Sequence, residues 1–199
     1  MSYDFNTRKE MLDGLIDYTK NSDDMNIRIK EIIKDNLLKC PELLYALHNV
    51  AYEDELFDED GNLIEDGDWS VYFGDNIRPY VFFPETQTEV KNYLCFKVDF
   101  IESPRYNAIE KYIDIVFLII VNGKDIVDKH TGIPRHDLIS SILRDKFSWT
   151  NIFGNQCKIT ENKEGSTDND YVMRTMAFRM TATNSILKNG KVINYKANV

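Results

Sequence analysis

YLCFKVDF (residues 93–100) and, after a short link, AIEKYIDIVFLIIVNG (residues 108–123) are the two stretches that decide the fold. In the first, apolar and polar residues alternate, which places Leu94, Phe96 and Val98 on one face and predicts a half-buried β-strand. The second alternates at its start and then becomes apolar on both faces. This pattern is typical of a long strand whose distal half is covered on both sides, by helices or by another subunit. The link IESPRYN is short enough for the two strands to form an antiparallel pair.

The first fifty residues predict helices. A loose apolar stripe precedes residue 20 and predicts a first helix. Isoleucines and leucines then recur at helical spacing over residues 27–38, and the residues before them are suited to capping a helix. CPELLYALHNVAY (residues 40–52) predicts a third helix with Pro41 in its first turn. His48 lies within that stretch, and we expect it to be a polar or partly buried helix residue and not a metal ligand.

Further strands are expected on both sides of a central helix. WSVYF (residues 69–73) and RPYVFF (residues 78–83) predict short aromatic strands, with prolines at edges or strand ends. Residues 155–184 predict two strands around the polar loop ENKEGSTDND (residues 161–170). The Asn-Gly pair at residues 189–190 predicts a final hairpin.

The order of these elements predicts an α+β fold: a mainly antiparallel sheet with a covering helix and an N-terminal helical segment. We expect residues 1–52 to form the helical segment and residues 53–199 to form the α+β core domain, with an acidic insert at residues 53–68. A chain of 199 residues fits this organisation.

The acidic insert carries the whole net charge of the protein. It holds nine of the 33 acidic residues and no basic residue, so 24 acidic residues balance the 24 Lys and Arg residues elsewhere. No basic patch suited to phosphates is visible, which argues against sequence-independent DNA binding. We expect the insert to project as a mobile hairpin or loop that faces a channel or a partner protein. Six acidic residues are the candidates for this contact: Asp58, Glu59, Asp60, Glu65, Asp66 and Asp68.

A calcium-binding loop of the EF-hand type is excluded by spacing. Placing Gly61 at loop position 6 puts Leu56 at position 1 and Gly67 at position 12, where carboxylates are required. The Asp-Gly pairs of the insert instead indicate turns.

HTGIPRHDLISSILRDKFSW (residues 130–149) contains two of the three histidines, and it has two interpretations. The pair His136-Asp137 is similar to the metal site of HD-type phosphohydrolases, but that chemistry needs further ligands on neighbouring helices. The alternative is a helix over residues 135–147 that covers the sheet with Leu138, Ile142 and Leu143. We favour the helix, because every polar residue of the stretch suits a helix end.

No other catalytic pattern is complete. Asp99 and Asp114 fall on adjacent predicted strands like a nuclease carboxylate pair, but Glu110 and Lys111 would lie on opposite faces and do not complete it. The nucleophile-elbow, P-loop and dinucleotide-binding fingerprints are missing. The sequence therefore predicts a protein that is not an enzyme, with no catalytic residue, no cofactor and no metal site.

The sequence also bears on the cellular location. The N-terminus is polar and unlike a signal peptide, and the most apolar run, IDIVFLIIV, is shorter than the ~20 residues of a membrane-spanning helix. Three widely spaced cysteines form neither a disulfide framework nor a zinc motif. We expect assembly in a reducing cytoplasm, without membrane contact.

YLCFKVDF, KYIDIVFLIIVNG, HTGIPRHDLISSILRDKFSWTNIFG and DYVMRTMAFRM follow one another between about residues 90 and 183. In this order they resemble the small neck proteins of tailed bacteriophages, in particular the tail terminators. The resemblance implies an α+β subunit of a ring, in that family a hexamer, at the head–tail junction of the virion. Its partners would be copies of itself and other neck, connector and tail-tube or sheath proteins, with DNA passing through without specific binding.

Two alternatives from other classes remain at this point. One is a metal-dependent phosphohydrolase or nuclease that uses His136 and Asp137. The other is a host-directed regulatory protein whose acidic insert mimics nucleic acid. A negative surface also suits a channel, because it repels phosphates and lets DNA slide.

Overall fold

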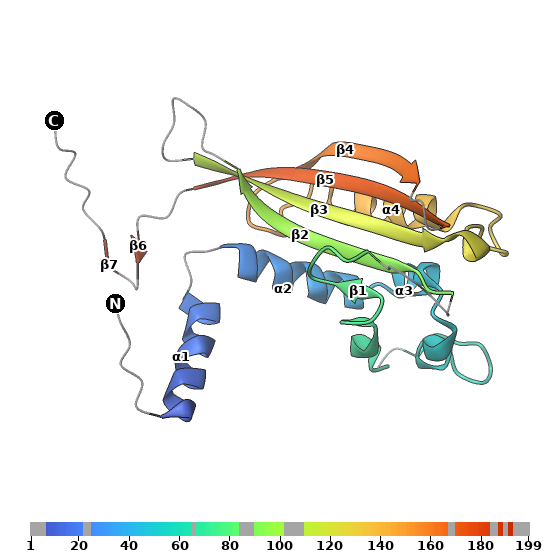
Figure 1. The fold of residues 1–199 in the computed structure, drawn as a ribbon, viewed down its shortest axis with the longest axis horizontal. Helices are drawn as coiled ribbons and strands as arrows, with labels where there is room; N and C mark the ends of the chain where they lie inside the picture. Colours follow the sequence, from blue (N-terminus) through green and yellow to red (C-terminus); the bar gives the residue numbers. More distant parts are fainter. Residues whose placement is uncertain are drawn as a thin grey trace.

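The structure is a computed structural model, and it has the mixed α+β architecture that the sequence predicts (Figure 1). A mainly antiparallel sheet is covered by helices on one face, and the two hairpins of the sheet are separated in the chain by a helix. The residues that the structure describes are 7–21, 25–64, 67–83, 90–101, 110–166, 170–183, 187–188 and 191–192.

The helices follow the apolar periodicities of the sequence. Apart from the first, they pack on the sheet, and short 3₁₀ helices lie in the connections. The α-helices are α1 (Arg8–Asn21), α2 (Met25–Leu38), α3 (Pro41–Leu47) and α4 (Arg135–Phe147), and the 3₁₀ helices are η1 (Val50–Glu55), η2 (Trp69–Tyr72) and η3 (Gly123–Asp125).

The strands form one five-stranded sheet in the order β1-β2-β3-β5-β4 and a separate two-stranded ribbon. All pairs are antiparallel except the short β1–β2 pair. The strands are β1 (Ile77–Arg78), β2 (Tyr93–Ile101), β3 (Glu110–Asn122), β4 (Cys157–Ser166), β5 (Tyr171–Thr183), β6 (Leu187–Lys188) and β7 (Lys191–Val192).

The predicted pair of long strands is confirmed as β2 and β3. Their register runs from Tyr93 opposite Ile120 to Ile101 opposite Tyr112. The link between them, residues 102–109, lies outside the described residues. β3 is central because its other edge pairs with β5 over its whole length.

The core lies between one face of the sheet and helices α2, α3 and α4. Phe117 of β3 is fully buried there and stacks on Phe147 of α4, with ring centroids 5.2 Å apart, while Phe178 of β5 meets Phe117 edge-on. Aromatic rings in these arrangements add about 0.5–1.5 kcal/mol per pair to their burial. Ile33 of α2 and Leu44 of α3 complete this core, so helices from the N-terminal segment share it with the sheet.

The opposite face of the sheet is only partly covered. Leu118 and Ile120 of β3 are buried there against Tyr93 and Tyr171, and Phe82 from the chain after β1 packs on them. The expectation that β3 is covered on both faces is therefore confirmed. Among the described residues, Phe82 from the segment after β1 supplies the second cover, and no helix packs on this face.

Four local predictions were wrong. The helix expected over residues 40–52 ends at Leu47, because His48 takes a left-handed conformation with a φ of 50°.

The other three concern strands. WSVYF forms η2, because Asp68 accepts hydrogen bonds from the backbone N–H and the hydroxyl of Ser70 and so caps a 3₁₀ turn. RPYVFF contributes only Arg78 to a strand, since the next residue, Pro79, has no N–H to give to a ladder. The expected polar loop at residues 161–170 is largely strand, because β4 continues to Ser166 after a bulge between Ile159 and Glu161.

The predicted helix over residues 135–147 is confirmed, but its buried face is rotated. Ile139, Leu143 and Phe147 are fully buried, whereas Leu138 and Ile142 are only half-buried. These three buried residues are spaced by four, so they share the face of the helix that packs on the sheet.

The C-terminal hairpin prediction is confirmed by antiparallel pairing of β6 with β7, although the Asn-Gly turn itself, residues 189–190, lies outside the described residues. The division of the chain at residue 52 stays a prediction. None of the described helices is both long and apolar enough to cross a lipid bilayer.

Candidate functional site

The first turn of α4 gathers the ionisable residues that the sequence singled out. A tight turn precedes it, in which the Asp128 carboxylate accepts hydrogen bonds from the backbone N–H and the hydroxyl of Thr131, both at 2.8 Å. Gly132 has a positive φ of 69°, and the backbone N–H of Arg135 donates to the carbonyl of Ile126. This turn fixes the start of α4, so that Arg135 and His136 project into two different clusters.

The Arg135 cluster consists of Arg135, Asp125, Asp128, His48 and Asn92. Arg135 is buried, and its guanidinium contacts the Asp125 carboxylate at 3.2 Å and the Asp128 carboxylate at 3.3 Å. Asp125 also contacts the His48 ring at 2.7 Å and accepts a hydrogen bond from the Asn92 amide at 2.9 Å. These contacts join the end of α3, the start of β2 and the start of α4.

Asp128 is nearly inaccessible, and burial alone would raise its pKa. The two hydrogen bonds from Thr131 and the charge of Arg135 outweigh that effect, so the pKa of Asp128 lies below its usual value. Asp128 is therefore ionised at neutral pH, and the Arg135 cluster is an ionic and hydrogen-bonded support of the fold.

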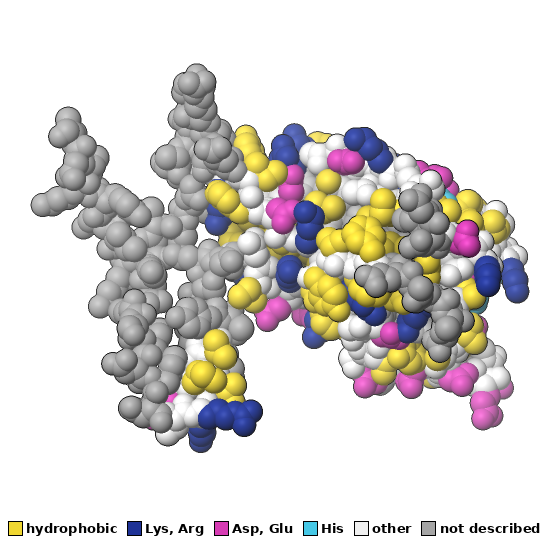
Figure 2. All heavy atoms as spheres, viewed as in Figure 1, with side chains coloured by type: hydrophobic (Ala, Val, Ile, Leu, Met, Phe, Trp, Pro, Cys, Tyr) yellow, Lys and Arg dark blue, Asp and Glu magenta, His cyan; other side chains and the backbone are white. Residues whose placement is uncertain are grey.

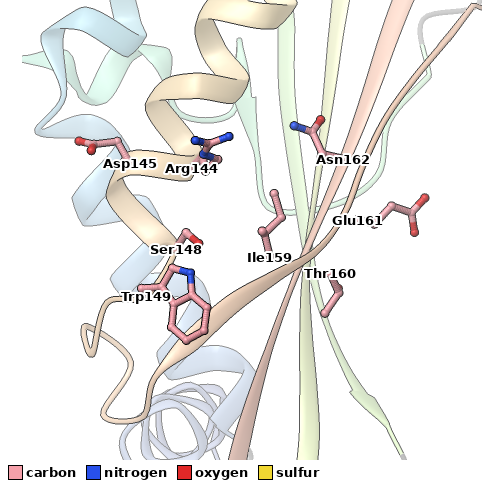
Figure 3. Close-up of a pocket in the computed structure, with 8 residues that line it drawn as sticks. All are labelled: Arg144, Asp145, Ser148, Trp149, Ile159, Thr160, Glu161 and Asn162. Carbon is pink, nitrogen blue, oxygen red and sulfur yellow. The ribbon is translucent and has the colours of Figure 1, made fainter.

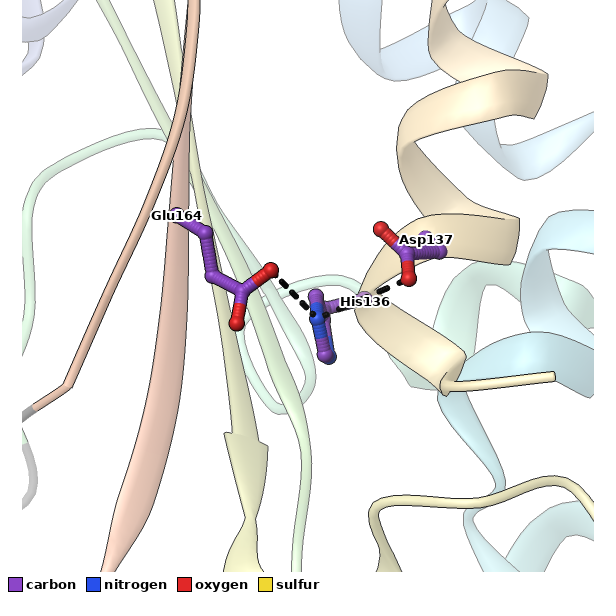
Figure 4. A group of neighbouring side chains, drawn as sticks. All are labelled: His136, Asp137 and Glu164. Carbon is purple, nitrogen blue, oxygen red and sulfur yellow. Dashed lines mark ion pairs between the residues drawn. The ribbon is translucent and has the colours of Figure 1, made fainter.

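The His136 cluster consists of His136, Asp137, Glu164 and Arg174. Figure 4 shows the first three of these side chains. His136 Nε2 lies 3.4 Å from Glu164 Oε2 and 3.8 Å from Asp137 Oδ2. The Arg174 guanidinium, from the core face of β5, contacts Asp137 Oδ1 and lies 2.9 Å from Glu164 Oε2. His136 is 4% exposed, and its Nδ1 has no hydrogen-bond partner among the described residues.

The other histidines do not join this cluster. His130 lies exposed in the turn before α4, and His48 ends α3 with a positive φ of 50° and contacts Asp125. The structure therefore brings together His136 and Asp137 of the sequence-derived alternative, but not the extra histidine ligands that were considered for it.

The acidic insert begins and ends against the body of the protein. Leu56 is buried in the core, and the indole N–H of Trp69 donates to the carbonyl of Glu55 at 2.9 Å. Between them, Phe57 and Leu63 form a bridge that closes a turn around Gly61, whose φ is 80°. The Asp-Gly turn predicted at this position is confirmed.

We call residues 57–68 of the insert the acidic turn, and its described carboxylates point into solvent. The Asp58 side chain accepts hydrogen bonds from the backbone N–H groups of Asn62 and Asp60, which lower its pKa. Figure 2 shows acidic side chains gathered over the segment between α3 and β1. The candidate residues Asp58, Glu59, Asp60 and Asp68 are exposed, whereas Glu65 and Asp66 lie outside the described residues.

The two aspartates that suggested a nuclease pair are opposite each other in the β2–β3 register. Each has its own cation: Arg179 binds Asp114 through two hydrogen bonds of 2.7 and 2.8 Å, and Lys97 lies 2.6 Å from Asp99. These pairs compensate the charges on the outer face of the sheet.

A groove of about 630 Å³ lies between the end of α4 and β4 (Figure 3). Trp149 stands at its mouth, 66% exposed, with a positive φ of 62° that is rare for a bulky residue. Its backbone N–H donates to the carbonyl of Cys157 at 2.6 Å, which holds the strained conformation in place. The groove is lined by Arg144, Asp145, Ser148, Trp149, Ile159, Thr160, Glu161 and Asn162.

The three cysteines are buried free thiols. Burial raises the pKa of all three, and that of Cys157 reaches about 12. Thiolates are the reactive form, so these cysteines are inert in the folded protein at neutral pH.

A family model named YomW matches residues 40–180, from the cysteine that precedes α3 to Met180 in β5. The chain belongs to the YomW family. The family takes its name from a protein of the Bacillus phage SPBc2 region, which suggests a phage-related protein. The residues matched to YomW include the acidic turn, the groove and both clusters of α4. No curated protein matches the chain.

Sequence reasoning missed Glu164 and Arg174. Both lie on strand residues that face the core side of the sheet, opposite each other in the β4–β5 register. Glu164 was placed in a loop because the stretch around it is polar, and edge strands are often polar.

Proposed function

We propose that this YomW-family protein is a structural virion subunit of a tailed-phage neck, of the tail-terminator type. Six copies of it form a ring at the head–tail junction. The family's phage-related name and the resemblance of residues 90–183 to neck proteins support the proposal. The role is structural and not catalytic. The subunit assembles in the host cytoplasm, and the virion is its final location.

The observation that carries the proposal is the sheet with two open edges. Among the described residues, β4 pairs only with β5, and β1 covers only Leu94 and Cys95 of β2. Unpaired edges are templates for pairing with another chain. β2, β3, β5 and β4 alternate in direction, so β2 of one copy placed beside β4 of the next continues the antiparallel order.

Such a contact joins two different surfaces of the same subunit. Repeated contacts of this head-to-tail kind generate closed rings when the rotation between copies closes. Trp149 lies beside the β4 edge, and an exposed tryptophan next to a groove is typical of residues that anchor interfaces.

The acidic turn supplies the second contact surface. Its exposed carboxylates suit either the channel, where they repel DNA phosphates, or a basic surface on a neighbouring connector, tail-tube or sheath protein. Since screening limits their reach to about 8 Å at physiological salt, they act only on groups that come close.

Cross-linking tests the edge-to-edge ring. Lys97 of β2 and Lys163 of β4 lie on the outer face of the sheet, with exposed side chains. We expect the double variant K97C/K163C, treated with a short bis-maleimide, to give a ladder of covalent oligomers that ends at the ring size. Images of the same sample should show rings.

The single variants K97C and K163C are the matched controls. Each should stop at dimers, because each chain then carries one reactive thiol and can be linked to only one other chain. The buried native cysteines should not react. If the treated double variant gives no covalent oligomers at concentrations where the wild type is oligomeric, the edge contact is contradicted. A wild type that is monomeric at all concentrations, with no rings in images, would contradict the ring itself.

A further inference from the structure

We propose that His136, Asp137 and Glu164 bind one divalent transition-metal ion, of which Zn²⁺ is the best fit. The ligand atoms of the three side chains lie within 4.8 Å of one another. In a tetrahedral zinc site with bonds of 2.0–2.2 Å, neighbouring ligand atoms are about 3.3–3.6 Å apart. The distances from His136 Nε2, 3.4 Å to Glu164 Oε2 and 3.8 Å to Asp137 Oδ2, are close to that spacing.

The burial of His136 points independently to a ligand. Its ring is nearly inaccessible, and Nδ1 has no hydrogen-bond partner among the described residues. Nε2 is directed at the two carboxylates over distances longer than an ordinary hydrogen bond (Figure 4). A buried polar atom without a good partner costs about 1–3 kcal/mol. A metal ion would supply such a partner to Nε2, and Nδ1 would carry the proton of the neutral imidazole.

Arg174 holds one oxygen of each of the two carboxylates. It contacts Oδ1 of Asp137, whereas Oδ2 is the oxygen nearest to His136. Glu164 uses Oε2 for its contacts with both Arg174 and His136, which leaves Oε1 as a further donor. A group that holds the free oxygen of a ligating carboxylate fixes its orientation, so Arg174 acts as a positioning residue.

The charges agree with a cation. Two carboxylates face one guanidinium, which leaves one negative charge beside a buried imidazole. One nitrogen and two carboxylate oxygens favour zinc and similar ions, since Mg²⁺ and Ca²⁺ prefer oxygen ligands alone. The fourth position would be taken by water.

The elements that hold the ligands give the ion a structural consequence. His136 and Asp137 belong to the first turn of α4, and Glu164 belongs to the edge strand β4. A bound ion would cross-link the covering helix to the edge strand. This inference does not depend on the proposed neck function.

Zinc titration of the untagged, metal-stripped full chain tests the site by calorimetry. We expect one Zn²⁺ per chain, an affinity at least 100-fold lower in His136→Ala, and at least 10-fold lower in Glu164→Gln. Glu164 is more than half exposed, so Glu164→Gln should keep the fold, and circular dichroism checks this. His130→Ala removes an exposed histidine and should bind zinc like the wild type.

Thermal melting gives a second readout. Zinc should raise the melting temperature of the wild type and of His130→Ala but not that of folded Glu164→Gln. Mg²⁺ in tenfold excess should not displace the zinc. The proposal is overturned if the wild type binds no stoichiometric zinc, if Glu164→Gln binds as tightly as the wild type, or if His130→Ala loses the site.

Discussion

Two neighbouring residues at the start of α4 enter opposite kinds of polar cluster. Arg135 enters a cluster whose carboxylates also accept hydrogen bonds from Asn92 and from Thr131. His136 enters a cluster whose carboxylates contact Arg174, while one of its own ring nitrogens has no partner among the described residues. Nε and Nη1 of Arg135 also lack a hydrogen bond among the described residues, but they lie 3.2 and 3.3 Å from the carboxylates of Asp125 and Asp128. Ion pairs therefore compensate the first cluster, and the second retains binding capacity.

Burial of an ionisable residue does not by itself reveal its role. Arg135 and His136 are both nearly inaccessible. They differ in that the carboxylates around Arg135 also accept hydrogen bonds from other donors, Asn92 and Thr131. Removing a cation that faces two poorly accessible carboxylates leaves their charges uncompensated, whereas an apolar side chain of similar size can replace an imidazole that makes few hydrogen bonds.

The largest expected effect is that of Arg135→Ala. It leaves Asp128 buried without its cation, so we expect the free energy of unfolding to fall by about 3–5 kcal/mol. Urea denaturation measures this. Arg144→Ala, which replaces an exposed arginine on the same helix, is the control and should change the value by less than about 0.5 kcal/mol. A loss below about 1 kcal/mol in Arg135→Ala would remove the basis of the comparison.

Asp128→Asn should have the next largest effect, about 1–3 kcal/mol at neutral pH, because the amide cannot replace the charge that faces Arg135. The pKa of Asp128 is lowered in the folded state, so its contribution is present above the unfolded value of about 3.9 and is lost as the pH falls through the folded pKa. The free energies of unfolding of wild type and variant should therefore become similar in acid. Denaturation curves from pH 7 to pH 2.5 check this, and a difference independent of pH would contradict it.

His136→Leu, measured without metal, should change stability by less than about 1.5 kcal/mol. An apolar side chain of similar size then replaces an imidazole whose Nδ1 has no partner among the described residues and whose Nε2 makes only long contacts. The measurement is urea denaturation in the presence of a chelator. A cost of 3 kcal/mol or more would show that the His136 cluster is as important for stability as the Arg135 cluster.

The smallest effect on stability is expected from the acidic turn. Neutralising Asp58, Glu59, Asp60, Glu65 and Asp66 together with amides should leave the melting temperature unchanged. Charges as exposed as those of Asp58, Glu59 and Asp60 contribute little, and the amide oxygen introduced by Asp58→Asn can still accept the backbone hydrogen bonds of the turn. Docking to a partner ring or the rate of DNA ejection should change. If the variant joins heads to tails and ejects DNA normally, the turn has no role beyond solubility.

The sequence could predict the elements whose pattern is set locally. The β2–β3 pair, α2, α3, the limits of α4 and the Asp-Gly turn follow from periodicity and turn chemistry, which act within a few residues. The polar stretch at residues 161–166 could not be assigned, because its strand state depends on pairing with β5. An edge strand is stabilised by a partner distant in sequence and not by its own apolar pattern.

The same limit applies to the sites. His136 and Asp137 were noticed because they are adjacent, but Glu164 and Arg174 come from strands whose register with each other only the fold defines. Arg135 was taken as a residue at a helix end, and its burial depends on Asp125 and Asp128 in the preceding turn. Ion pairs between distant segments have no periodicity to detect.

The insertion of β5 between β3 and β4 has a consequence for the folding kinetics. β2–β3 and β4–β5 are both pairs of consecutive strands, which close short loops, whereas the β3–β5 ladder joins residues about 60 positions apart across α4. Non-local pairing must first overcome the entropy of closing the intervening chain, and it slows folding. We therefore expect the two hairpins to form early and their union along β3 and β5 to limit the rate, so that substitutions such as Phe117→Ala slow folding more than they speed unfolding.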